Sequence, residues 1–75
     1  MQELVEYIAR SLVENPDQVR VSTRRSGSSY YVDVTAAQGD LGRLIGRRGR
    51  TAQAIRSVAK VAAARQGLRI TIDID

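Results

Sequence analysis

The chain has 75 residues, which is enough for one domain with a small core and too few for two. It contains no cysteine and no histidine, which excludes disulfides, thiolate or imidazole metal sites, thiol nucleophiles and the most common general base. The remaining acids, serines and tyrosines form no pair around a plausible pocket. We therefore expect a protein that is not an enzyme and that needs no metal or cofactor.

The net charge of +4 is unevenly distributed along the chain. Residues 1–40 hold four arginines and six acids, whereas residues 41–75 hold seven arginines and one lysine against two aspartates. No acid occurs between Asp40 and Asp73. A stretch of one sign and of this length suggests a polyanionic partner, and a plain compositional preference for arginine is the alternative.

No segment is apolar enough to suggest a membrane protein, because the longest apolar run is far short of the roughly 20 residues that span a bilayer. The first residues, MQELVEYIARSL, carry acids and no continuous apolar stretch, unlike a secretory signal. We expect no membrane contact and a cytoplasmic location.

The first predicted element is a helix, because Leu4, Val5, Ile8 and Leu12 recur at helical spacing before Asn15-Pro16 stops the pattern. Residues 19–24 and 30–36 then alternate apolar and polar side chains on either side of the turn RSGSS. This pattern predicts a β-hairpin.

In the second half, Asp40 is a candidate N-cap for a short helix over 41–45. A longer helix is expected from residue 50 or 51 to 65, where Gly67 ends it, and residues 68–74 alternate as a final strand. The inward stripe of the long helix is predicted to contain Ala52, Ile55, Ala59 and Ala62. The order α-β-β-α-α-β predicts a single α+β domain over residues 1–75, with three helices on one face of a three-stranded sheet.

The stretch LIGRRGR at 44–50 places Gly46-Arg47-Arg48-Gly49 between the two later helices. Glycines there allow a tight turn and the close approach of a sugar-phosphate backbone, and the start of a helix favours a phosphate. Arg47 and Arg48 add positive charge without reading a base. The alternative is a plain turn with solvated arginines, and the acid-free surroundings favour the phosphate site.

At these residues the chain resembles the KH-domain family, whose signature is an apolar residue, Ile and G-x-x-G between two helices. The order of elements looks like the type II arrangement of prokaryotes. The segments LVEYIARSLVENPDQV and LGRLIGRRGRTAQAIR are similar to the bacterial stand-alone KH proteins called KhpA. Ala52 departs from the pattern, because many KH domains place a larger aliphatic residue there.

The resemblance implies single-stranded RNA in a groove between the two helices and an adjacent strand, with the RNA backbone clamped at the GRRG loop. It implies a small RNA chaperone or post-transcriptional regulator, and self-pairing or pairing with a second KH protein, KhpB. The signature and its charged surroundings supply the candidate RNA-binding residues: Ile45, Gly46, Arg47, Arg48, Gly49, Arg50, Arg43, Arg56 and Lys60. The hairpin turn occupies the family's variable loop and adds Arg24 and Arg25, for which a solvated hairpin end is an equally good interpretation.

Three other classes of protein are alternatives to a KH domain. A helix-turn-helix protein would carry its charge along a recognition helix rather than in the turn. An RRM would stack bases on aromatic residues of its sheet, but the chain has no Phe or Trp and only Tyr31 is expected on the open face. A protein–protein assembly module is the main alternative, because Ala54, Val58 and Val61 form a second apolar patch that either makes an interface or widens the buried face.

Overall fold

A computed structural model describes residues 1–75. The helices and strands follow the predicted α-β-β-α-α-β order: α1 (Gln2–Leu12), β1 (Arg20–Ser26), β2 (Ser29–Thr35), α2 (Leu41–Ile45), α3 (Arg50–Ala64) and β3 (Arg69–Ile74). Short 3₁₀ turns lie in three of the connections: η1 (Pro16–Gln18), η2 (Gln38–Asp40) and η3 (Arg47–Gly49). The α+β class predicted from the sequence is confirmed.

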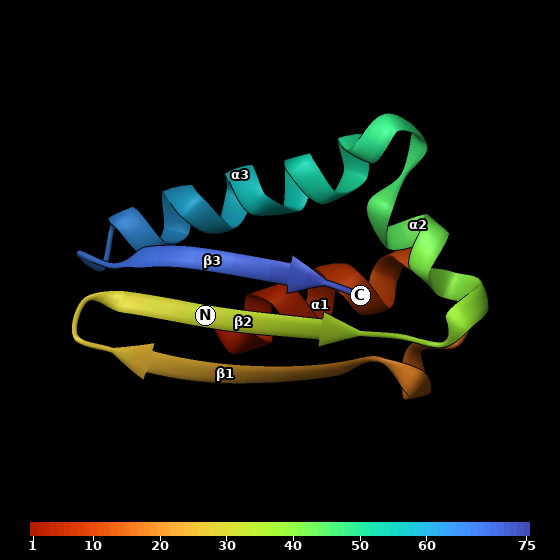
Figure 1. Cartoon of the computed structure of the whole chain (residues 1–75), viewed down its shortest axis with the longest axis horizontal. Coiled ribbons are helices and arrows are strands. Elements are labelled where there is room, and N and C mark those ends of the chain that lie inside the picture. Colours follow the sequence, from red (N-terminus) through yellow and green to blue (C-terminus); the bar gives the residue numbers. More distant parts are fainter.

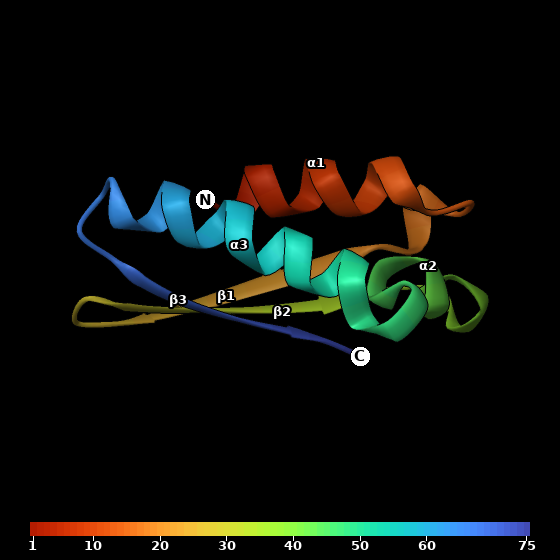
Figure 2. The same ribbon diagram turned by 90° about the horizontal axis from the view of Figure 1, so that it is seen from above.

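The three strands form one mixed sheet in the order β1-β2-β3 (Figure 1). The hairpin strands β1 and β2 are antiparallel, whereas β2 and β3 are parallel because α2 and α3 lie between them in the chain. Figure 2 shows α1 and α3 over one face of the sheet and α2 near the end where β2 and β3 finish. The opposite face of the sheet carries no helix.

The core lies between the sheet and α1 and α3. Strand alternation turns Val32 and Val34 of β2 inward, and their register partners Ile72 and Ile74 of β3 lie on the same face. The central cluster of buried side chains consists of Val5, Ala9, Val19, Val32, Val34, Leu44, Ile55, Ala59 and Ile72.

The helical stripes differ from the predicted ones by single positions. Ala63, not Ala62, is buried on α3, because the step of four from Ala59 brings Ala63 back to the inward face and leaves Ala62 at its edge. On α1, Ala9 is buried, whereas Leu12 of the last turn is 40% exposed.

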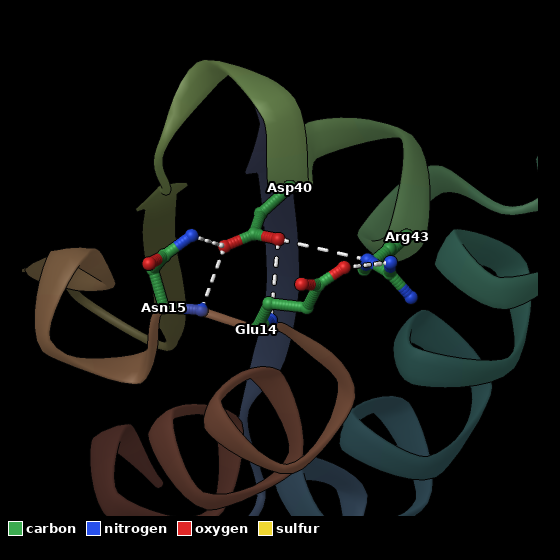
Figure 3. Close-up of polar contacts among 4 residues, drawn as sticks. All are labelled: Glu14, Asn15, Asp40 and Arg43. Atoms are coloured by element: carbon green, nitrogen blue, oxygen red, sulfur yellow. Dashed lines mark hydrogen bonds and ion pairs between the residues drawn. The ribbon is translucent and has the colours of Figure 1, made fainter.

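Asp40 occupies the N-cap position of α2, as predicted, but its carboxylate makes no capping hydrogen bond there. Only 2% of Asp40 is exposed, and its carboxylate accepts hydrogen bonds from the backbone N–H of Glu14 and of Asn15 and from the Asn15 side-chain amide (Figure 3). Burial alone would raise the pKa of Asp40, but these bonds and nearby Arg43 outweigh it and lower the pKa below its ordinary value. Asp40 therefore ties the segment after α1 to the start of α2.

Candidate nucleic-acid interface

The GRRG loop begins with a turn that only glycine fits. Gly46 has φ 77° and ψ 172°, and its N–H donates to the carbonyl of Gly42 at 2.8 Å to close α2. A Cβ built on Gly46 would lie 2.1 Å from the Oγ1 and 2.8 Å from the backbone nitrogen of Thr51. The first loop glycine is thus required by packing against the first turn of α3.

Gly49 differs, because a Cβ built there would meet nothing within 4 Å. Its φ of 73° still favours glycine, but the space above its backbone is open. Between the two glycines Arg48 has φ 59° and is the one non-glycine residue of the chain with positive φ. This conformation costs an L-residue roughly 1–2 kcal/mol, and such strain clusters at ligand sites.

The positive charge of the loop is not neutralised within the protein. Arg47, Arg48 and Arg50 are exposed, and the three ion pairs of the structure use only Arg10 and Arg43 as cations. The loop also stands at the start of the fifteen-residue helix α3, where the helix dipole is positive. Three unpaired guanidinium groups and a helix start therefore occupy one turn.

A groove runs between α3 and β3, the strand at the edge of the sheet. It encloses about 290 Å³ and is lined by Arg56 and Lys60 of α3 and by residues 70–72 of β3. The Nε of Arg56 donates a hydrogen bond to the carbonyl of Ile72 at 3.1 Å, so its charged head is fixed at the strand. Thr71 on the strand side was missed from the sequence, because only the strand order shows that β3 has a free edge.

The other candidates near the loop have different surroundings. Ile45 is 40% exposed, whereas its neighbour Leu44 is completely buried. Arg43 is held by an ion pair with Glu14 and lies 3.6 Å from the Asp40 carboxylate (Figure 3). Arg43 therefore helps to hold α2 against the segment after α1, whereas Ile45 is available at the surface.

Arg24 and Arg25 are not brought to the GRRG loop. They stand at the end of β1 next to the hairpin turn, and both views place this turn and the α2–α3 connection at opposite ends of the long axis (Figures 1 and 2). The Arg24 guanidinium carbon lies 4.8 Å from the centre of the Tyr31 ring, and the Arg25 Nε donates to the carbonyl of Gly27. Because consecutive residues of a strand face opposite sides of the sheet, Arg24 and Arg25 do not share one surface. Their contact with RNA stays a prediction.

No helix has the length and apolar character needed to cross a bilayer. No three acidic side chains gather where they could hold a metal ion.

The element order, the mixed sheet and the G-x-x-G loop between α2 and α3 define a KH domain of the type II arrangement. A family model of the KH domain of KhpA and KhpB matches residues 2–74, so the chain belongs to this KH family, a non-enzymatic kind of protein.

Three relatives, each named RNA-binding protein KhpA, match almost the whole chain. The protein of Halalkalibacterium halodurans is 46% identical over 74 residues, which cover 99% of this chain and 97% of the relative. That of Clostridium acetobutylicum is 42% identical, with 99% of both chains covered. That of Borreliella burgdorferi is 38% identical over 96% of this chain and 88% of its own length.

Proposed function

We propose that this protein binds single-stranded RNA in the cytoplasm, clamps the sugar-phosphate backbone at the GRRG loop and acts as a small RNA chaperone or post-transcriptional regulator. The observation that carries the proposal is the exposed GRRG loop and the start of α3, whose three arginines have no acidic partner. The name of the relatives, RNA-binding protein KhpA, supports RNA as the polyanion.

Each part of the site has a distinct role in this proposal. Gly49 leaves open space in which a phosphate can approach the backbone, and Arg47, Arg48 and Arg50 supply the charge. Bases would then lie in the groove beside Arg56 and Lys60, with Ile45 as an apolar contact. Arg43 contributes less, because Glu14 and Asp40 already hold it.

The test is the binding of a labelled single-stranded RNA measured by fluorescence polarisation at about 50 and 200 mM salt. We expect affinity to fall as salt rises, because phosphate contacts release counterions. In a plot of the logarithm of the association constant against the logarithm of the salt concentration, each phosphate contact should add about −0.7 to the slope. An affinity that salt leaves unchanged would contradict the electrostatic clamp. A preference for duplex DNA would favour a helix-turn-helix mode of binding.

The deciding variant combines Arg47→Asp with Arg48→Asp. It should abolish RNA binding and keep the fold, since acids suit the start of α3 and Asp tolerates the left-handed conformation of position 48. The matched control combines Arg10→Asp with Arg20→Asp, which changes the net charge equally outside the loop and should retain most binding. Circular dichroism checks the fold of both variants. A folded loop variant that binds RNA like the parent would refute the clamp.

A second function, self-assembly, is favoured by the apolar face, which we define as Leu12, Ala54, Val58 and Val61. Val58 is 50% and Val61 59% exposed, so these residues do not extend the core. Hollows of about 530 and 480 Å³ run along this face of α3 and share Val58. We propose that the face pairs with a second copy of this chain; pairing with a KhpB-like KH protein is the alternative outcome.

A further inference from the structure

The open face of the sheet carries one aromatic side chain. Residues of β2 and β3 that alternate with the buried Val32 and Ile72 lie on the face that has no helix over it. Most of them are serine, threonine or aspartate. Tyr31 and Arg69 are the exceptions, and Tyr31 is half-buried among polar neighbours.

Two arginines stand on either side of Tyr31. Arg24 of β1 is its cross-strand partner, with the guanidinium carbon 4.8 Å from the ring centre. On the other side Tyr31 pairs with Thr71 of β3, and Arg69 lies two residues before Thr71 on the same face. Both arginines are exposed and neither makes an ion pair. Arg24, Tyr31 and Arg69 form what we call the Tyr31 platform.

The charge on the open face changes sign just beyond the platform. Asp33 and Asp73 are register partners on β2 and β3, so two like charges face each other across the strands. The half of the face near the hairpin turn therefore attracts anions, and the other half of β2 and β3 repels them. On β2 and β3, a polyanion is therefore favoured at the platform over the half that holds Asp33 and Asp73.

We propose that the Tyr31 platform is a second contact for single-stranded RNA, at which one base stacks on Tyr31 beside Arg24 and a phosphate meets Arg69. This inference rests on the proposed RNA binding and extends it to the side of the sheet opposite the helices. An aromatic ring offers the face of any base a stacking surface, and flanking arginines serve the backbone. The Tyr31 ring and its flanking arginines together therefore match one nucleotide, which offers a base to the ring and a phosphate to a guanidinium group.

The platform is continuous with the groove. Thr71 lines the groove at the edge of the sheet and is also the register partner of Tyr31. Neighbouring strands lie about 4.8 Å apart, so the ring is one strand in from that edge. An RNA that leaves the groove over β3 passes next over the platform, whereas an RNA that only fills the groove does not reach it. The platform should therefore affect long RNAs alone.

The experiment compares a short RNA of about 5 nucleotides, enough for one KH groove, with a long RNA of about 12. Tyr31→Thr removes the ring and keeps a good strand former. It should weaken binding of the long RNA about fivefold or more and leave binding of the short RNA unchanged. Tyr31→Phe should bind both like the parent. Arg69→Ala should lower the salt slope for the long RNA by about 0.7 and leave the short one unchanged.

Arg20→Ala is the matched control, because Arg20 lies on the same strand and face as Arg24 but at the end away from the hairpin turn. It should change neither affinity by more than about twofold. The platform is refuted if Tyr31→Thr and Arg69→Ala bind the long RNA like the parent, or if they weaken both RNAs equally. In those cases the loss of binding by the Arg47→Asp, Arg48→Asp protein still supports the clamp. A parent that binds neither RNA would overturn the proposed function as well.

Discussion

Gly46 and Gly49 are the same residue type with the same sign of φ, but their surroundings differ. The protein itself fills the space beside Gly46, whereas the space beside Gly49 is open. The sequence could predict a turn with glycines at both positions. It could not predict this difference, because the neighbour that crowds Gly46 is a side chain of the next helix, Thr51.

Alanine at these two positions should therefore separate stability from binding. Gly46→Ala should lower the free energy of unfolding by about 2–4 kcal/mol, from left-handed strain together with overpacking against Thr51. Gly49→Ala should cost about 1 kcal/mol of stability but should weaken RNA binding, since its methyl group occupies the open space. Urea unfolding and RNA titration measure the two effects. Equal destabilisation by both variants would contradict this distinction.

Arg48 is a second residue at which stability and binding are expected to conflict. Arg48→Asn should keep or raise the free energy of unfolding, by up to about 1 kcal/mol, because Asn tolerates positive φ better than Arg. It should also weaken RNA binding through the lost charge. Arg47→Asn is the control: it loses the same charge without positive φ and should give no gain in stability. Thermal melting compares the two, and an identical melting temperature would argue against stored strain at Arg48.

At the scale of elements, apolar periodicity predicted each helix and strand to within a few residues, because that signal is local. The contacts that fix the elements to each other are not local. Asp40 matches an N-cap pattern, yet its partners are 25 and 26 residues away in the chain. Arg43 likewise reaches Glu14 at a separation of 29 residues. Neither the contacts of Asp40 nor the contact of Arg43 with Glu14 produces a periodic pattern in the sequence from which it could be predicted.

The tie made by Asp40 predicts a dependence of stability on pH. Its pKa is lower in the folded protein than in the unfolded chain, so its contribution is complete above the ordinary aspartate pKa of about 3.9 and is lost as pH falls through the lower folded value. Asp40→Asn should therefore be less stable than the parent at pH 7, and the two unfolding free energies should converge in strong acid. Urea unfolding from pH 7 to about pH 2 follows both.

Asp75→Asn, at an exposed position, serves as the control for the change in net charge and should follow the parent at every pH. An Asp40→Asn protein that runs parallel to the parent down to the lowest pH would show that the carboxylate is not the stabilising group.

For the whole molecule, the uneven charge of the sequence becomes an uneven surface. The acid-poor residues after Asp40 form α2, α3 and β3, which lie together on one side of the molecule because α3 packs on β3 (Figure 1). The sequence could therefore indicate a polyanionic partner. The sequence could not predict that Arg24 and Arg25 lie at the far end of a 34 Å axis from the GRRG loop. The residues of a turn predict its local conformation, but they do not predict its distance from another loop.

Three of the four residues of the apolar face lie on α3, the helix that follows the GRRG loop, and the fourth, Leu12, lies on α1. No residue of the face belongs to the GRRG loop, so pairing and RNA binding can be tested with separate variants. If two copies pair through the apolar face, dilution separates them, and the melting temperature should rise with protein concentration. Val58→Asp puts a charge at the centre of the face and should abolish this dependence, because an unpaired buried charge opposes association. Since Val58 is half exposed, the monomer should remain folded.

Ser57→Asp is the control, because residue 57 is a neighbouring exposed position outside both hollows, and this variant should keep the dependence of melting temperature on concentration. Sedimentation over a hundredfold range of concentration checks the oligomeric state directly, and a parent that stays monomeric throughout would rule out self-pairing and leave a KhpB-like protein as the partner to test.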